Sequence, residues 1–214
     1  MIRACIFDLD GVIVDTAHYH FIAWRRLAKE LGVVLTEKEN ERLKGVSRMS
    51  SLEIILALGG VVLGEAEKEK LAEKKNAWFV EYVNAMKPEE IFPGVKKLIL
   101  DLKNLGIKVA LASSSKNAGT VIQLLKIEKE FDAVVDGKMV THSKPDPEIF
   151  LLAAKKLGVE PGYCVVFEDA EAGVEAALRA GMKCVGVGSA DQLGKANLVV
   201  KKTADVDITK LNRL

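Results

Sequence analysis

The chain has 214 residues, 49% of them hydrophobic, and its 31 lysines and arginines nearly balance its 30 aspartates and glutamates. This size supports one substantial domain, or a domain with a smaller insertion, that folds without disulfides. The balanced charge argues against a strongly basic nucleic-acid groove or a polybasic membrane surface, so we expect neither nucleic acid nor membrane as a partner.

The three cysteines, Cys5, Cys164 and Cys184, are far apart, and each lies in a short apolar run. This spacing favours buried thiols in a reducing compartment over a disulfide set or a metal cluster. No signal-peptide pattern precedes the first apolar run, and the longest apolar stretch, 54–64, is too short to span a bilayer. We therefore expect a cytoplasmic protein.

The first predicted element is a buried strand over 1–7, because its apolar run is too short for a helix. Asp8 and Asp10 follow, and side chains two residues apart on an extended chain point the same way. Two adjacent carboxylates repel each other unless a cation neutralises them or one keeps a proton. Asp8 could therefore bind Mg²⁺ and attack phosphorus while Asp10 protonates a leaving oxygen. A polar turn before a helix explains the pair about equally well.

The pattern then becomes helical until about residue 86. An amphipathic helix is expected over 17–31, ended by Gly32. His20 lies on the apolar stripe of this helix. A histidine there more often packs than reacts, so both roles stay open.

Two cationic side chains stand out in the remainder of this helical region. Arg48 precedes a helix that Ser50 and Glu53 are expected to open as a capping box; it can bind an anion there or remain solvated. The longest helix is predicted over 65–86, and Lys75 falls inside its apolar face. A lysine at such a position must snorkel along the apolar stripe or meet an anion.

From residue 91 the pattern alternates helix and strand, as a parallel sheet requires. Polar groups follow two of the strands: Ser113 to Ser115 lie between a strand and a helix, and Glu168 and Asp169 end a later strand. Lys144 precedes a proline in a loop. Serine caps and loop lysines are ordinary features, but a second acidic pair at a strand end is harder to dismiss. Strands are predicted over 108–112, 134–135, 164–167, 184–187 and 198–200.

An aspartate pair, a serine-rich strand end, a lysine before proline and an acidic pair thus follow one another in order. This set resembles the four motifs of the haloacid dehalogenase-like superfamily, whose members form an aspartyl-phosphate. The resemblance implies an α/β fold with a Rossmann-like parallel sheet core, residues 1–14 and 89–214. An all-helical cap domain, residues 15–88, is inserted through two adjacent hinge strands.

The same resemblance implies one Mg²⁺ per chain. Its expected ligands are the carboxylates of Asp8, Glu168 and Asp169 and the backbone carbonyl of Asp10. Lys144 and the serine hydroxyls at 113 and 114 would spread the charge of the transition state.

The insertion carries a finer resemblance, in the runs 44–48 and 23–28 and the pair 75–76, together with 110–113 of the core. These runs resemble the β-phosphoglucomutase family. This implies an enzyme that interconverts β-D-glucose 1-phosphate and D-glucose 6-phosphate through β-glucose 1,6-bisphosphate, the activating intermediate. We also expect a monomer. A sugar-phosphate phosphatase is the alternative, because the core motifs are shared. A non-catalytic sugar-phosphate sensor is a third reading, which the intact pair Asp8 and Asp10 argues against.

A mutase must hold a second phosphate away from the reacting one, and the resemblance assigns this role to the region of Arg48. It also implies that His20 and Lys75 couple ligand binding to the placement of Asp10 through the hinge near Thr16. Two positions depart from the family pattern: Ala170 replaces a common serine, and Ser114 replaces an alanine. The expected catalytic residues are Asp8, Asp10, Thr16, His20, Lys75, Ser113 and Lys144, and the expected substrate-binding residues are Gly45, Val46, Ser47, Arg48, Ser51, Lys75, Asn76, Ser113, Ser114, Ser115, Lys116, Asn117 and Lys144.

Overall fold

The computed structural model describes residues 1–214 and contains a six-stranded sheet in the order β3-β2-β1-β4-β5-β6. All five strand pairs are parallel. The chain order reverses at β1, so the crevice beyond the carboxyl ends of the central strands is where such sheets bind ligands. This confirms the predicted α/β class. The strands are β1 Ala4–Phe7, β2 Lys108–Ala112, β3 Ala133–Val135, β4 Cys164–Glu168, β5 Lys183–Val187 and β6 Leu198–Val200.

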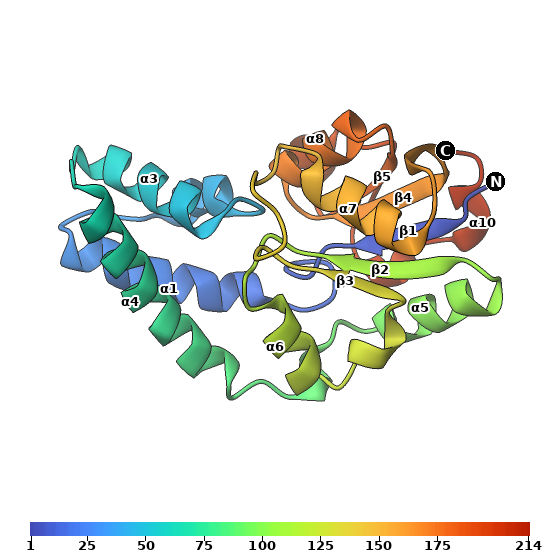
Figure 1. The fold of residues 1–214 in the computed structure, drawn as a ribbon, viewed down its shortest axis with the longest axis horizontal. Coiled ribbons are helices and arrows are strands. Elements are labelled where there is room, and N and C mark those ends of the chain that lie inside the picture. The colour runs from blue at the N-terminus through green and yellow to red at the C-terminus, as the bar shows by residue number, and fades with distance from the viewer.

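Helices cover both faces of the sheet (Figure 1). Cys5 and Phe7 of β1 pack into the apolar cluster under α5 and α6, whereas Ala4 and Ile6 pack into the cluster under α7 and α8. Because both faces are buried, the strands are continuous apolar runs rather than alternating ones. The helices of this part are α5 Val95–Asn104, α6 Ala118–Leu124, α7 Glu148–Leu157, α8 Glu171–Arg179, α9 Ala190–Leu193 and α10 Ile208–Leu211.

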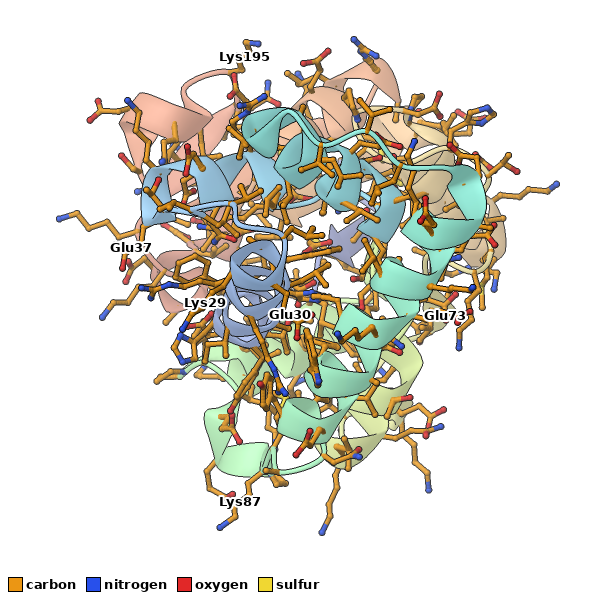
Figure 2. The ribbon with its side chains drawn as sticks, turned by 90° about the vertical axis from the view of Figure 1, so that its left-hand side faces the viewer. Lys29, Glu30, Glu37, Glu73, Lys87 and Lys195 are labelled. Carbon is orange, nitrogen blue, oxygen red and sulfur yellow. The ribbon has the colours of Figure 1, made fainter.

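The remaining four helices form the cap, at the left of Figure 1. They enclose an apolar cluster of their own that includes Trp24, Leu27 and Ile55. Viewed from its outer side, the cap projects charged side chains such as Glu30 and Glu73 (Figure 2). An inserted helical cap is therefore present, while the domain boundaries at 14/15 and 88/89 remain predictions. The cap helices are α1 Thr16–Glu30, α2 Glu37–Asn40, α3 Arg48–Gly59 and α4 Glu65–Val83.

The two connections between cap and core lie side by side. Val14 forms an antiparallel bridge with Ile91, and Phe92 N donates to Ile13 O at 2.9 Å. The sequence predicts helix as far as residue 86, but α4 ends at Val83 and a 3₁₀ turn follows. The second connection therefore pairs with the first at Ile91 and Phe92, a few residues after position 86, where the helix is predicted to end.

The predicted capping box at Ser50 and Glu53 is wrong. Helix α3 begins at Arg48, with Ser47 as its N-cap, whose Oγ accepts from Ser50 N at 3.1 Å. Glu53 instead forms an ion pair with Lys68 of α4 at 2.6 Å. No helix of the chain is both long enough and apolar enough to cross a bilayer.

Candidate active site

The register of the sheet brings the acidic strand ends together. Phe7 of β1 pairs with Leu111 on one side and with Phe167 on the other. Asp8, which follows Phe7, therefore lies at the level where the neighbouring strands reach their serine and acidic ends. Asp8 N donates to Phe167 O at 2.9 Å, so its backbone is fixed as an extension of the sheet.

A tight loop follows Asp8 and carries Asp10. Asp10 N donates to Asp8 Oδ2 at 3.0 Å, and Gly11 N donates to Val14 O at 2.9 Å. Gly11 has φ +76°, and a Cβ there would lie 2.0 Å from Asp169 Oδ2. Only glycine satisfies both the backbone conformation and this close approach.

Lys144 crosses from its loop to join two of the carboxylates. Its Nζ lies 2.6 Å from Asp8 Oδ1 and 2.8 Å from Glu168 Oε2, and its side chain is 0% exposed. Burial alone would lower the pKa of Lys144, but the two carboxylates raise it above its usual value. Lys144 therefore stays charged and ties Asp8 to Glu168.

This single ammonium group faces four carboxyl groups. Carboxylate oxygens of Asp8, Glu168 and Asp169 lie within 4.8 Å of one another. Burial, opposed by Lys144, raises the pKa of Glu168 to about 7. Burial and then Asp8 raise the pKa of Asp10 to about 8, and Asp10 Oδ1 is buried without a hydrogen-bond partner. Carboxyl groups thus outnumber the ammonium group here, and the raised pKa values of Glu168 and Asp10 reflect burial without a further cation.

The serines after β2 differ in how they use their hydroxyl groups. Ser113 Oγ accepts from Ser115 N at 3.1 Å, and Ser115 Oγ accepts from Asn117 N at 3.2 Å, so both hydroxyls keep a proton to donate. Ser114 Oγ instead donates to Gly45 O of the cap at 2.9 Å. Ser114, which stands where the family pattern has an alanine, therefore forms a hydrogen bond between the core and the cap.

The cap contributes cations without acidic partners. Lys75 Nζ lies 2.7 Å from His20 Nδ1 and 4.5 Å and 4.9 Å from the ring centres of Trp24 and Phe79. Burial and then Arg48 lower the pKa of Lys75 well below its usual value. Burial, Lys75 and Arg48 likewise lower the pKa of His20, so its imidazole is neutral and accepts from Lys75.

Asn76 connects these cap residues to the core. Its Oδ1 accepts from Arg48 Nη2 at 2.8 Å and from Asn117 Nδ2 at 2.7 Å. Burial lowers the pKa of Arg48, although Glu73 opposes this, and no carboxylate forms an ion pair with the guanidinium. The Arg48 side chain is therefore oriented by an amide and remains available to an anion.

Besides a wider cavity of about 700 Å³, a smaller one of about 90 Å³ that reaches Asp8 and Asp10 lies between the two halves. It brings together most of the predicted residues, while Thr16, Asn76, Ser113, Lys144 and Glu168 lie just outside its lining. The Thr16 hydroxyl is buried without a partner. The lining also contains residues that the sequence analysis did not assign to the site, although Trp24 and Lys44 lie in runs that carry the family resemblance. These are Ala17, Trp24, Asn40, Leu43, Lys44 and Gly137.

Comparison with known proteins identifies the family. The family model "haloacid dehalogenase-like hydrolase" matches residues 2–181. This chain belongs to the haloacid dehalogenase-like hydrolase family. It is 45% identical to the β-phosphoglucomutase of Bacillus subtilis over 98% of this chain and 94% of that protein.

Two further members of the family are similar to this chain. The crystal structure of the β-phosphoglucomutase of Clostridium difficile matches with a TM-score of 0.96 and 45% identity, over 100% of this chain and 96% of that one. The phosphorylated carbohydrates phosphatase of Thermotoga maritima is 39% identical over 85% of this chain and 82% of that protein. The family therefore includes both mutases and phosphatases near this chain.

Haloacid dehalogenase-like enzymes use Mg²⁺ in general, and the residues of this site fit it. Three carboxylates converge, only one ammonium offsets them, and no protein group donates to the carbonyl oxygen of Asp10. Oxygen donors of this kind are the ligands that Mg²⁺ prefers.

The other departure from the family pattern, Ala170, faces the cap, because a Cβ on Gly45 would lie 2.9 Å from that of Ala170.

Proposed function

We propose that this chain is a β-phosphoglucomutase that interconverts β-D-glucose 1-phosphate and D-glucose 6-phosphate. The high identity to the B. subtilis mutase over nearly the whole of both chains carries this proposal. The cap supports it, because Arg48 and Lys75 both line the cavity and neither forms an ion pair with a carboxylate. A second phosphate on the sugar is the anion that fits this arrangement.

In the proposed reaction Asp8 attacks phosphorus, a bond forms between a carboxylate oxygen and phosphorus, and the bond from phosphorus to the sugar oxygen breaks. Asp10 gives its proton to that leaving oxygen. Its pKa of about 8, raised by burial and Asp8, means that it carries a proton at neutral pH. In the reverse direction Asp10 takes the proton of a sugar hydroxyl, which attacks the aspartyl-phosphate and frees Asp8.

We propose that Mg²⁺ is held by Asp8, Glu168, Asp169 and the carbonyl of Asp10. When bound, it supplies positive charge that reduces the repulsion between the Asp8 carboxylate and the incoming phosphate. Lys144 holds Asp8 in place through their 2.6 Å contact. Ser113 and Ser115 have hydroxyl protons to donate to phosphoryl oxygens, and losing one such donor typically costs roughly a hundred- to a thousand-fold in rate.

The cap would exclude water while the intermediate turns around. The cavity holds about 90 Å³, which is smaller than the roughly 300 Å³ or more of typical ligand pockets. The hydrogen bond from Ser114 to Gly45 joins the core directly to the cap. A sugar phosphate must open the cap to enter, and closure then protects the aspartyl-phosphate from hydrolysis.

A sugar-phosphate phosphatase is the second candidate, because the T. maritima phosphatase is 39% identical. Its reaction would use the same Asp8 and Asp10 with water as the final acceptor. The cations of the cap favour the mutase, since a hydrolase has no need to hold a second phosphate.

The two functions differ in their products. Purified protein with Mg²⁺ is given β-glucose 1-phosphate and a catalytic amount of β-glucose 1,6-bisphosphate, and both glucose 6-phosphate and inorganic phosphate are measured. We expect glucose 6-phosphate to account for nearly all substrate consumed. Release of one inorganic phosphate per substrate would assign the phosphatase function instead.

A further inference from the structure

The loop that carries Asp10 is fastened by a residue near the end of the chain. Thr203 Oγ1 donates to Val12 O at 2.7 Å, across 191 residues of sequence. Both residues are buried, with Thr203 2% exposed and Val12 0% exposed. No water can replace this donor without a rearrangement, so loss of the hydroxyl would leave a buried carbonyl unpaired.

The segment around Thr203 is itself firmly seated. A Cβ on Gly94 would lie 2.7 Å from that of Ala204, which shows how closely the segment approaches the start of α5. Leu211 further along belongs to the same apolar cluster as Val12 and Ile13. The segment lies beyond residue 181, where the match to the family model ends. Thr203 is therefore a fixed anchor point rather than a loose terminal residue.

Apart from the bond from Asp10 N to Asp8 Oδ2, the other hydrogen bonds of residues 9–14 are between backbone groups. Gly11 N donates to Val14 O within the loop, and Phe92 N donates to Ile13 O from the second connection. Thr203 is the side chain that holds the loop from outside. Asp8 does not depend on it, because Asp8 N is bonded to the neighbouring strand at Phe167.

We propose that Thr203 is a positioning residue for proton transfer, which holds the loop through Val12 so that the Asp10 carboxyl meets the sugar oxygen. This inference rests on the proposed function. Proton transfer needs Asp10 within hydrogen-bond reach of that oxygen, and a displacement of about 1 Å can cost roughly a hundred-fold in rate. Attack by Asp8 should be far less sensitive, since the sheet fixes it.

The test compares two phosphate donors in Thr203→Val, which keeps the shape and removes the hydroxyl. Acetyl phosphate loses a weakly basic carboxylate and needs little help from an acid, whereas a sugar phosphate loses a strongly basic alkoxide. We expect kcat for β-glucose 1-phosphate to fall about ten- to a hundred-fold with little change in KM. Phosphorylation of Asp8 by acetyl phosphate should stay within about twofold of wild type.

Two matched variants complete the experiment. Thr203→Ser keeps the hydroxyl, so its rate with the sugar phosphate should equal that of wild type. This variant can be measured even if the valine variant does not fold. Thr209→Val makes the same chemical change in the same segment, but Thr209 bonds only to Asp207, so both rates should be unchanged. Equal losses with both donors, no loss with either, or failure of serine to restore the rate would overturn the proposal.

The result stays separable from the proposed function. If the wild-type protein releases inorganic phosphate instead of glucose 6-phosphate, the mutase assignment fails. The comparison of sugar phosphate with acetyl phosphate is then made on hydrolysis, where Asp10 must still protonate the sugar oxygen.

Discussion

The site contains two buried lysines in opposite surroundings, one in the core and one in the cap. Lys144 of the core contacts Asp8 and Glu168, which raise its pKa despite burial. Lys75 of the cap contacts a neutral imidazole and two aromatic rings, and burial lowers its pKa. The core therefore pairs its lysine with its own carboxylates, while the cap leaves its lysine without an anionic partner, a place that a ligand phosphate can fill. The two halves are suited to different tasks, chemistry in the core and phosphate binding in the cap.

The largest expected effect is on the acid and base of the core. Asp10→Asn should lower kcat by about 10²- to 10⁴-fold, because the amide cannot exchange the proton. Mg²⁺ affinity, measured by calorimetry, should change little, since only the backbone carbonyl of Asp10 is proposed as a ligand. Asp15→Asn removes an exposed carboxylate nearby and serves as the control. A large loss of Mg²⁺ affinity with a small loss of rate would contradict the assigned role.

The comparison of the two lysines can be made directly by replacing each with methionine. Lys144→Met leaves two buried carboxylates without their partner and should lower the free energy of unfolding by about 3–5 kcal/mol. Lys75→Met removes an amino group that contacts no carboxylate, and loss of its contact with His20 should change the free energy of unfolding by only about 1 kcal/mol. Urea denaturation without ligand measures both. Equal destabilisation by the two substitutions would show that the halves do not differ as described.

His20 gives the cap a dependence on pH. Its folded-state pKa lies well below the usual 6.5, because burial and two nearby cations disfavour the charged ring. As the pH falls below that usual value, the unfolded chain takes up the proton first, so His20 lowers the free energy of unfolding.

Below about pH 6.5, the free energy of unfolding of wild type should therefore fall relative to that of His20→Gln, by up to about 1.4 kcal/mol per pH unit. His18→Gln, an exposed histidine on the same helix, should show no such shift. Urea denaturation at several pH values measures it, and parallel stability curves for wild type and His20→Gln would refute the expectation.

The smallest expected effect concerns one of the hydrogen bonds between the core and the cap. Ser114→Ala removes the hydrogen bond to Gly45, which is worth about 0.5–1.5 kcal/mol, and so shifts the cap equilibrium toward open by about two- to ten-fold. Inorganic phosphate released per glucose 6-phosphate formed should rise by a similar factor, because water gains access. Ser114→Thr keeps the hydroxyl and should behave as wild type. An unchanged product ratio in the alanine variant would remove this contact from the account.

The acidic half of the site could be predicted because sequence order and strand ends determine it. Asp8 and Glu168 each end or follow a short apolar strand, and parallel strands deliver such residues to one edge. Lys144 needed the family resemblance, since nothing in its loop indicates that it reaches two buried carboxylates 136 and 24 residues away.

The cap could be predicted less completely. Ser47 and Ser50 are both good N-caps, so residue type alone does not decide between them, and in the structure Ser47 caps α3. Asn40 lines the cavity only because the short helix α2 is placed beside it, which no periodicity indicates. The Thr203 contact with the Asp10 loop is equally invisible in the sequence, because it joins segments 191 residues apart.

The division of labour between core and cap is tested most directly in Arg48→Ala, with Arg42→Ala, an exposed arginine of the same cap, as control. The measurement compares phosphorylation of Asp8 by β-glucose 1,6-bisphosphate and by acetyl phosphate, which carries no sugar and no second phosphate. We predict that Arg48→Ala lowers kcat/KM for the bisphosphate by about 10²- to 10³-fold and leaves the reaction with acetyl phosphate unchanged. An equal loss with both donors, or no loss with the bisphosphate, would contradict the account.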